Sequence, residues 1–308
     1  MEQNENNIEE IAKSFLVEKA VGNLKESSLS RYTYLCKKYI IPYFKDIHPT
    51  DLNNESIENF IQHLRNGCIS GKPLAPKTIN DILSLLLQII KSGCQFEIDI
   101  KKLTLKQSEI NIFTEAEYSK LKSYLLIATD NQKLGIMIAM LTGIRIGELC
   151  ALKWEDIDLE LGTVQIDKTI QRVKSMDVDA ISKTKVIIDT PKSTASIRTI
   201  PLPLILLSKL SEFRAGHDTY VLTNKKKYIE PRVYQRRFKS YLEACNIKDN
   251  KFHTVRHTFA TMAISRGMDI KTLSVLLGHT DVSFTMKTYV HPNLEHRRIQ
   301  IEKLAVGF

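Results

Sequence analysis

The sequence predicts a mainly α-helical protein with a small antiparallel β-sheet, divided into a helical N-terminal domain and an α+β C-terminal domain. Apolar residues recur at three- and four-residue steps through most of the chain, which is the spacing of amphipathic helices. Between residues 163 and 201 short strand-like runs and turn-forming residues replace this pattern. The 308 residues suit about two domains. We place them at residues 1–97 and 113–308, joined by a linker at residues 98–112.

Four helices are expected in the N-terminal domain. The first covers residues 8–20, the second begins near Ser27–Ser30, and the third covers residues 57–64 after capping groups at Asn53–Ser56. The fourth opens at Pro76 and ends at Gly93. Four helices within about 90 residues predict a compact all-α domain. The segment from Gly67 to Lys72 resembles a phosphate loop, but it is one residue short and Pro73 replaces the Ser or Thr that would hold magnesium.

The linker has an extended, basic character without clear periodicity. It carries Lys101, Lys102 and Lys106, which are available to phosphate groups. The C-terminal domain then opens with a helix from Thr114 to about Ile127, because Thr114 and Glu117 have the spacing of a capping box.

An arginine follows the next apolar helix, which ends at Gly143. Arg145 lies at a turn before a second helix at residues 146–152, so two rigid elements hold it, as preorganised phosphate binding requires. Glu148 is placed to hold the guanidinium group. The competing interpretation is a helix-capping arginine with a partner at the surface.

Three short segments, residues 163–167, 186–189 and 197–200, are expected to be strands. The turn at residues 190–196 puts Lys192 at a hairpin tip, either swung toward a phosphate or simply solvated. Helices at 203–213 and 231–244 flank a short strand at 220–222. The densest positive patch includes Lys225, Lys226, Arg236 and Arg237; it is either a solvated face or a surface that contacts DNA phosphates.

The stretch from His253 to His291 contains several residues whose side chains can take part in a reaction. His253 and Arg256 project from one face of a helix that ends near Gly267. His279 follows a shorter helix stopped by Gly278, and Tyr289 ends another. Arginine suits a phosphate, histidine moves protons near neutral pH, and a tyrosine hydroxyl can act as a nucleophile. Together these residues favour phosphodiester transesterification.

A metal site is the alternative for part of this stretch. His253 and His257 have the spacing of a zinc-binding helix, but Thr254 stands where that motif has its glutamate. We therefore expect neither a metal nor another cofactor.

Composition points to a cytoplasmic protein with a polyanionic partner. The formal net charge is +9 and the isoelectric point about 9.1, which favours nucleic acid over an anionic membrane surface. The 5 cysteines are scattered, without a close pair, as in a reducing compartment. The acidic N-terminus is unlike a signal peptide, and the longest apolar run, residues 79–90, is interrupted by polar residues and too short to span a bilayer.

Five ordered blocks resemble the tyrosine recombinases, the family of phage integrases, conjugative-transposon integrases and chromosome-dimer resolvases. The blocks are TGIRIGEL (142–149), TPKSTASIRTIPL (190–202), HTVRHTFA (253–260), LGH (277–279) and TY (288–289). The resemblance implies a helical core-binding domain, of the SAM-like type, and a catalytic domain that clamp double-stranded DNA.

Roles for single residues follow from the same resemblance. Arg145 and Arg256 are expected to clamp the scissile phosphate, and Tyr289 to attack it, leaving a 3′-phosphotyrosyl bond and a free 5′-hydroxyl. Lys192 would protonate that hydroxyl. His253 would handle the tyrosine proton, His279 would hydrogen-bond the phosphate, and Glu148 would support Arg145.

The resemblance also implies an assembly: a monomer in solution that forms a homotetramer on DNA through a Holliday junction, with C-terminal segments exchanged. Residues 293–304 suit such a segment. An excisionase or DNA-bending protein is a possible partner. The chain begins almost at its core-binding helices, so either it belongs to a branch without an arm-binding domain or an upstream piece precedes it. Two alternatives stay open: a type IB topoisomerase-like enzyme and a non-catalytic DNA-binding accessory protein.

Overall fold

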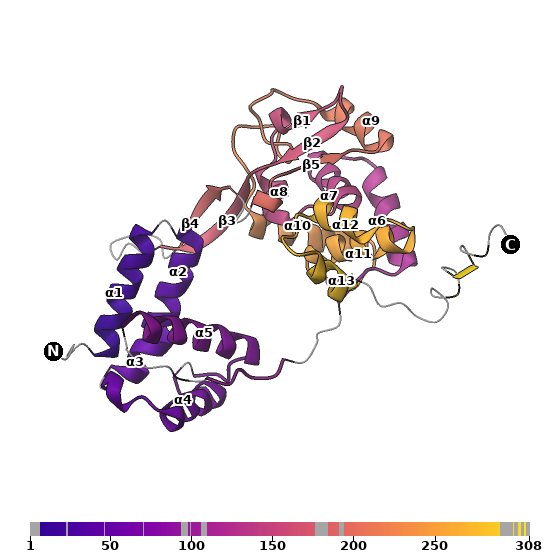
Figure 1. The fold of residues 1–308 in the computed structure, drawn as a ribbon. Coiled ribbons are helices and arrows are strands. Elements are labelled where there is room, and N and C mark those ends of the chain that lie inside the picture. The colour runs from indigo at the N-terminus through magenta and orange to yellow at the C-terminus, as the bar shows by residue number, and fades with distance from the viewer. Residues whose placement is uncertain are drawn as a thin grey trace. The chain divides into compact units, whose positions relative to one another are not determined.

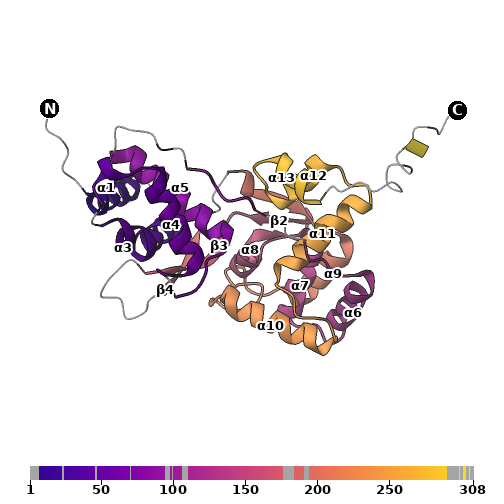
Figure 2. The ribbon, with the colours of Figure 1, turned by 90° about the horizontal axis from the view of Figure 1, so that it is seen from below.

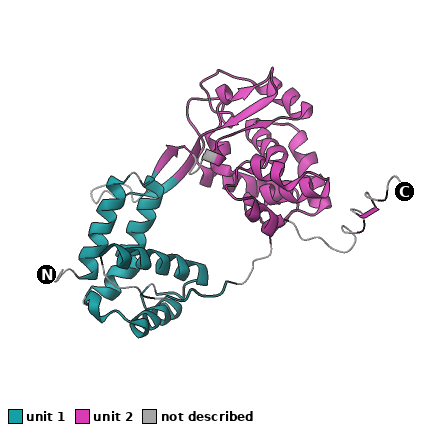
Figure 3. Ribbon diagram, in the orientation of Figure 1, with its two compact units in different colours: residues 1–108, 172–185 teal, residues 109–171, 186–308 magenta. Residues whose placement is uncertain are grey.

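The chain forms two compact units in the computed structural model (Figure 3). Unit 1 comprises residues 1–108 and 172–185, and unit 2 comprises residues 109–171 and 186–308. The structure describes residues 7–22, 24–45, 47–69, 71–93, 98, 100–105, 110–175, 184–190 and 194–289, with a few positions between 298 and 305. No helix among these residues is long and apolar enough to cross a membrane.

Unit 1 is helical, as predicted (Figure 1). Its helices are α1 (Ile8–Val21), α2 (Glu26–Leu35), α3 (Ile41–Phe44), α4 (Asn54–Asn66) and α5 (Pro76–Gly93). A π-helical turn at Cys36–Ile40 joins α2 directly to α3. The expected cap of α4 is present, because the Asn53 side chain accepts from the Ser56 amide at 2.9 Å. The apolar faces of these helices meet in one buried core.

The predicted linker is partly packed onto this helical unit. Ile100 is buried in the unit 1 core. The Asn80 side chain of α5 bonds both backbone groups of Leu103, at 2.8 and 2.9 Å. Ordered packing therefore continues past residue 97, and the boundary between the units falls after residue 108. Lys101 and Lys102 are exposed on this segment, and Lys106 lies outside the described residues.

Unit 2 contains the remaining helices, close to their predicted bounds. They are α6 (Glu115–Leu126), α7 (Asn131–Thr142), α8 (Ile146–Ala151), α9 (Leu204–Phe213), α10 (Pro231–Ala244), α11 (His253–Ser265), α12 (Ile270–Leu277) and α13 (Val282–Tyr289). The capping box that predicted α6 is formed by Thr114 and Glu117. Most of the segment proposed for a C-terminal helix, residues 293–304, lies outside the described residues.

The strands form two small sheets, not one. The sheet of unit 2 has the antiparallel order β1 (Ile157–Asp158), β2 (Thr163–Ile166), β5 (Arg198–Pro201). β3 (Thr169–Lys174), which the periodicity did not reveal, pairs with β4 (Thr184–Asp189). The predicted hairpin between residues 186–189 and 197–200 is therefore wrong, because these strands belong to different sheets. Lys192 lies in the connection between them, outside the described residues. The strand predicted at 220–222 is reduced to isolated bridges at Tyr220.

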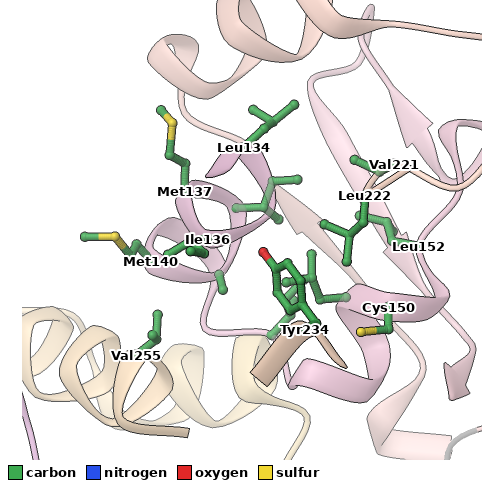
Figure 4. Packing of buried hydrophobic residues seen from close by; sticks show 14 of the residues in the cluster. Leu134, Ile136, Met137, Met140, Cys150, Leu152, Val221, Leu222, Tyr234 and Val255 are labelled. Atoms are coloured by element: carbon green, nitrogen blue, oxygen red, sulfur yellow. The ribbon is translucent and has the colours of Figure 1, made fainter. Parts of the chain in front are cut away.

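The core of unit 2 lies between α7, α8, α10 and the sheet. Figure 4 shows Tyr234 of α10 among Leu134 and Ile136 of α7 and Leu222 of the loop between α9 and α10. The Tyr234 side chain is fully buried, and its hydroxyl donates to the Gln132 carbonyl at 2.7 Å. Gly135 lets these side chains approach α7, because a Cβ there would lie 2.2 Å from Leu222 Cδ2 and 2.6 Å from the Tyr234 hydroxyl.

The helices α11, α12 and α13 lie together on one side of unit 2 (Figures 1 and 2). α7 and α12 each end on a left-handed glycine, Gly143 with φ of 67° and Gly278 with φ of 64°. Each glycine turns the chain sharply, so Arg145 and His279 follow immediately after a helix end. These two turns position the candidate site.

We expect Gly135→Ala to destabilise unit 2 by about 1–3 kcal/mol, since overpacking at Tyr234 and Leu222 outweighs a gain of about 1 kcal/mol in helix propensity. Urea unfolding followed by fluorescence measures this, because the chain's one tryptophan, Trp154, is buried in unit 2. Gly216→Ala is the matched control, as its Cβ would meet only ordinary contacts at 3.6 Å or more. Equal stability of Gly135→Ala and wild type would contradict the packing seen here.

Candidate active site in unit 2

Six of the seven residues predicted from the chemistry or the resemblance gather at one place in unit 2; the seventh, Lys192, lies outside the described residues. Arg145 and Glu148 come from the start of α8, His253 and Arg256 from α11, and His279 and Tyr289 from the ends of α12 and α13. Hydrogen bonds join Arg145 to Glu148 and Arg256 to His279, whereas Tyr289 bonds His257 and His253 lies against the ring of His257.

Glu148 is the buried carboxylate of the site. Its side chain is only 3% exposed and accepts from the backbone N–H of Arg145 at 2.9 Å and from Arg145 Nη1 at 2.7 Å. Arg198 donates to the other sides of the same carboxylate, at 2.9 and 3.2 Å. Burial alone would raise the pKa of Glu148, but the hydrogen bond and charge of Arg198, and then the charge of Arg145, lower it. The partner of Arg145 is therefore an ionised group in the interior and not a surface residue.

Arg256 is also buried, at 2% exposure. Its Nη1 donates to the Gly143 carbonyl at 2.9 Å, and its Nη2 donates to the Leu277 carbonyl at 2.7 Å. Burial, followed by the charge of Arg145, lowers its pKa to about 9. The guanidinium group thus remains charged at neutral pH, held by the carbonyls at the ends of α7 and α12.

The contacts of His279 fix its tautomer. Its Nε2 lies 2.8 Å from Arg256 Nη2, and its Nδ1 lies 2.8 Å from the Thr285 hydroxyl. Because arginine can only donate, we assign Nε2 as an acceptor and place the ring proton on Nδ1. Partial burial, followed by the charges of Arg256 and Arg145, lowers the pKa of His279 to about 4. The resemblance implies that His279 hydrogen-bonds the phosphate; in this structure its ring orients Arg256.

Tyr289 is 8% exposed, and its hydroxyl lies 2.8 Å from Nδ1 of His257. Burial raises the pKa of Tyr289, and the charges of Arg256 and Arg145 oppose that rise. Partial burial and the charge of Arg256 lower the pKa of His257, so its ring is neutral near pH 7 and able to accept a proton.

The ring that contacts Tyr289 is therefore His257, where the resemblance implied His253. The two imidazole rings are stacked edge to face at 4.5 Å, so His253 adjoins the contact without making it. His253 keeps an exposed edge, and partial burial with the charge of His257 lowers its pKa to about 4. Proximity to the nucleophile, and not the position in the motif, distinguishes the two histidines.

A pocket of about 270 Å³ opens beside Arg145. It is lined by Arg145, Ser196, Gly278, His279, Thr280, Asp281 and Phe284. Since a water molecule takes roughly 30 Å³ in the liquid, the pocket accommodates a tetrahedral oxyanion. Arg145 is the charged donor at its wall, with a side chain that is 36% exposed. This opening is where a phosphate group can reach the guanidinium group of Arg145.

The predicted phosphate-contact residues outside the site are at the surface of their own units. Lys225, Lys226, Arg236 and Arg237 are all exposed in unit 2. Lys226 is paired with Asp218 at 2.8 Å, which reduces the positive charge that it presents. Among the described residues, no group of three or more His, Cys, Asp or Glu side chains is arranged to hold a metal ion.

Two members of the site escaped prediction, Arg198 and His257. In β5, Arg198 and Ile200 share the buried face, so strand alternation alone signalled an inward-facing arginine. His257 was weighed only as a metal ligand, although it follows Arg256 directly. Its importance depends on the position of α13, which sequence spacing does not give.

An ionised arginine at a pocket, a second buried arginine, neutral imidazoles and a buried phenol form a site for moving a phosphoryl group to tyrosine. This chemistry and the two-unit fold define the class of tyrosine recombinases. The chain belongs to the phage integrase family, whose sequence pattern, "Phage integrase family", matches residues 101–296. A second pattern, "Phage integrase, N-terminal SAM-like domain", matches residues 7–65. The predicted family and fold class are thus confirmed.

Individual relatives are consistent with this family. A XerC-like tyrosine recombinase of Caldanaerobacter subterraneus is 33% identical over 64% of this chain and 54% of its own length, so the match spans about half of that relative. The ICEBs1 integrase of Bacillus subtilis is 26% identical over 88% of this chain and 75% of its own length. Among solved structures, a Tn1549 transposon integrase in complex with transposon right end DNA has a TM-score of 0.78 at 20% identity, covering 97% of this chain and 100% of that one. At that identity the likeness concerns the fold.

The contacts of His279 predict a pH dependence of stability. The folded pKa of about 4 lies below the ordinary 6.5, so the unfolded chain binds a proton that the folded chain does not. Stability is then full above pH 6.5 and falls as the pH drops toward 4. Urea unfolding at stepped pH, followed through Trp154, should show this slope, and His279→Asn should reduce it, leaving the part due to His253 and His257, whose pKa values are also lowered. An unchanged slope in His279→Asn would show that Nε2 is not held as an acceptor.

Proposed function

We propose that this protein is a site-specific DNA recombinase that integrates and excises a mobile genetic element through a phosphotyrosyl intermediate. The carrying observation is that Arg145 and Arg256 donate to consecutive carbonyls at the end of α12, that His279 bonds Arg256, and that Tyr289 lies in the same buried cluster as Leu277 of α12. Relatives support the mobile-element role, since they include the ICEBs1 integrase and the transposase of transposon Tn916 from Enterococcus faecalis.

Cleavage proceeds as a balanced exchange of phosphoesters. Arg145 and Arg256 bind the non-bridging oxygens of the scissile phosphate and stabilise the charge that develops there. The Tyr289 oxygen bonds to phosphorus as its proton moves to the imidazole in contact with it. The bond from phosphorus to the 5′-oxygen breaks, and Lys192 gives that oxygen a proton. The resulting 3′-phosphotyrosyl ester retains the energy of the broken bond, and attack by a 5′-hydroxyl reverses the steps on a new strand.

Assembly on DNA completes the cycle. One solved structure of similar fold is a lambda integrase tetramer bound to a Holliday junction, with a TM-score of 0.61 at 19% identity. We propose the same order of assembly for this chain, a monomer in solution and a tetramer on DNA, with Lys101, Lys102, Lys225, Arg236 and Arg237 contacting phosphates. Residues 293–304 are the candidate exchanged segment, and an excisionase or DNA-bending protein would set direction.

Tyr289→Phe should bind DNA as tightly as wild type and form no covalent adduct. The test uses a pool of nicked duplexes with randomised sequence around the nick, from which DNA attached to protein after SDS treatment is recovered and sequenced. The recovered sequence then supplies a defined suicide substrate, assayed with excess chelator, where we expect unchanged cleavage. An adduct formed by Tyr289→Phe rules out this nucleophile; relaxation of supercoils without strand exchange favours a topoisomerase.

His257→Asn should slow adduct formation by about 10²-fold, the scale of a lost general base, and His253→Asn should slow it less. Replacing Tyr289 by a fluorinated tyrosine, whose phenol is more acidic, should restore part of the rate in His257→Asn, since a weaker base then suffices. A purely structural loss would not respond to phenol acidity. A larger loss of rate in His253→Asn, partly restored by the fluorinated tyrosine, would identify His253 as the group that accepts the proton.

A further inference from the structure

Arg198 is an arginine in the interior of unit 2. It opens β5, and β5 alternates so that Arg198 and Ile200 face inward. Opposite it, Ile166 of β2 is the register partner. The Arg198 side chain is 3% exposed, as is that of Glu148. An unpaired charge in such a place costs several kcal/mol, so the surroundings must compensate it.

Compensation comes from three parts of unit 2. Nη1 and Nη2 of Arg198 form a two-pronged contact with the Glu148 carboxylate, at 3.2 and 2.9 Å. Nε donates to the Leu276 carbonyl at 2.6 Å, and Nη1 also donates to the Ser196 carbonyl at 3.0 Å. One guanidinium group therefore joins β5, the start of α8 and the end of α12.

The end of α12 receives three arginines on consecutive carbonyls. Leu276 accepts from Arg198, Leu277 from Arg256 and Gly278 from Arg145, at 2.6, 2.7 and 3.3 Å. These carbonyls carry the partial negative charge of a helix C-terminus, which favours cations. The two candidate phosphate-binding arginines and Arg198 thus share one backbone segment, so a shift of that segment moves them together.

Gly278 shows how closely Arg198 approaches this segment. A Cβ at Gly278 would lie 3.1 Å from Arg198 Nη1 and 3.2 Å from its Cδ. Arg198 thus rests against the turn that leads to His279 as well as against the carboxylate that holds Arg145.

We propose that Arg198 is a positioning residue for DNA cleavage: it fixes Glu148 and the Leu276–Gly278 segment and thereby sets the position of Arg145 at the phosphate pocket. This inference rests on the proposed function. Arg198 lies behind Glu148 and touches no reacting group. A lysine in its place keeps the charge but loses the planar fork that binds Glu148 and Leu276 at once.

Arg198→Lys should therefore bind the suicide substrate within twofold of the wild-type Kd and form the adduct at least tenfold more slowly at saturating DNA. Arg214→Lys, the same change at an exposed position of unit 2, is the control and should match wild type in both measurements. Arg198→Lys reacting at the wild-type rate would overturn the proposal. So would a rise in the apparent Kd together with a fall in rate, if both merely follow the unfolded fraction seen through Trp154.

A double-mutant cycle separates positioning from general damage. If Arg198 acts through Arg145, adding Arg198→Lys to Arg145→Lys should slow the adduct by less than threefold further. Full multiplication of the two effects would show independent actions and reject the proposal. The cycle compares rates of adduct formation at saturating DNA. A uniform loss of stability would leave the effects of the two substitutions on these rates additive in free energy.

A second variant tests the proposal if Arg198→Lys does not fold. Glu148→Gln with Arg198→Met removes both buried charges, a change that proteins often tolerate, and leaves an amide to cap α8. We expect a folded protein that binds DNA and forms the adduct at least tenfold more slowly. A wild-type rate in this variant would overturn the positioning role. Absence of any adduct with the wild-type chain would instead reject the proposed function, so the two failures are distinguishable.

Discussion

Repulsion between like charges is the constraint around which the site of this protein is built. Burial first, and then the nearby charges of Arg145 and Arg198, lower the pKa of Arg256. One buried carboxylate and the C-terminal carbonyls of α12 hold the three arginines in place. The arrangement leaves the site positive, which is the condition for attracting a phosphodiester into it. The glycines that end α7 and α12 support this geometry, because the end of a helix leaves its last carbonyls free to accept hydrogen bonds from the arginines.

Local signals in the sequence were sufficient for most elements. α10 has the predicted bounds, α12 ends before Gly278 as predicted, and α6 begins at its predicted capping box, because caps, prolines and glycines act within a few residues. The approximate convergence of Arg145, Arg256, His279 and Tyr289 followed from motif order and helix ends. Long-range pairing was less accessible. β3 has an alternating sequence too mixed to stand out, and its pairing with β4 removed the hairpin expected around Lys192.

The same distinction explains which contacts within the site could not be assigned from the sequence. Which histidine contacts Tyr289 depends on the packing of α13 against α11, because His253 and His257 are four residues apart and project from the same face of α11. The buried role of Arg198 depends on Glu148 and Leu276, which are 50 and 78 residues away from it in the chain. The residue types predicted phosphate chemistry, but the partner of each residue could be assigned only from the fold.

Tyr289 is the last residue of α13, and its hydroxyl is engaged by an imidazole of its own subunit. Terminal helical turns are the least costly parts of a helix to rearrange. A nucleophile placed there can shift toward a phosphate without disturbing the core behind it. For the recombinase proposed above, such a placement provides a safeguard: the reactive group stays sheltered until engagement with DNA supplies the small free energy that moves it to the phosphate.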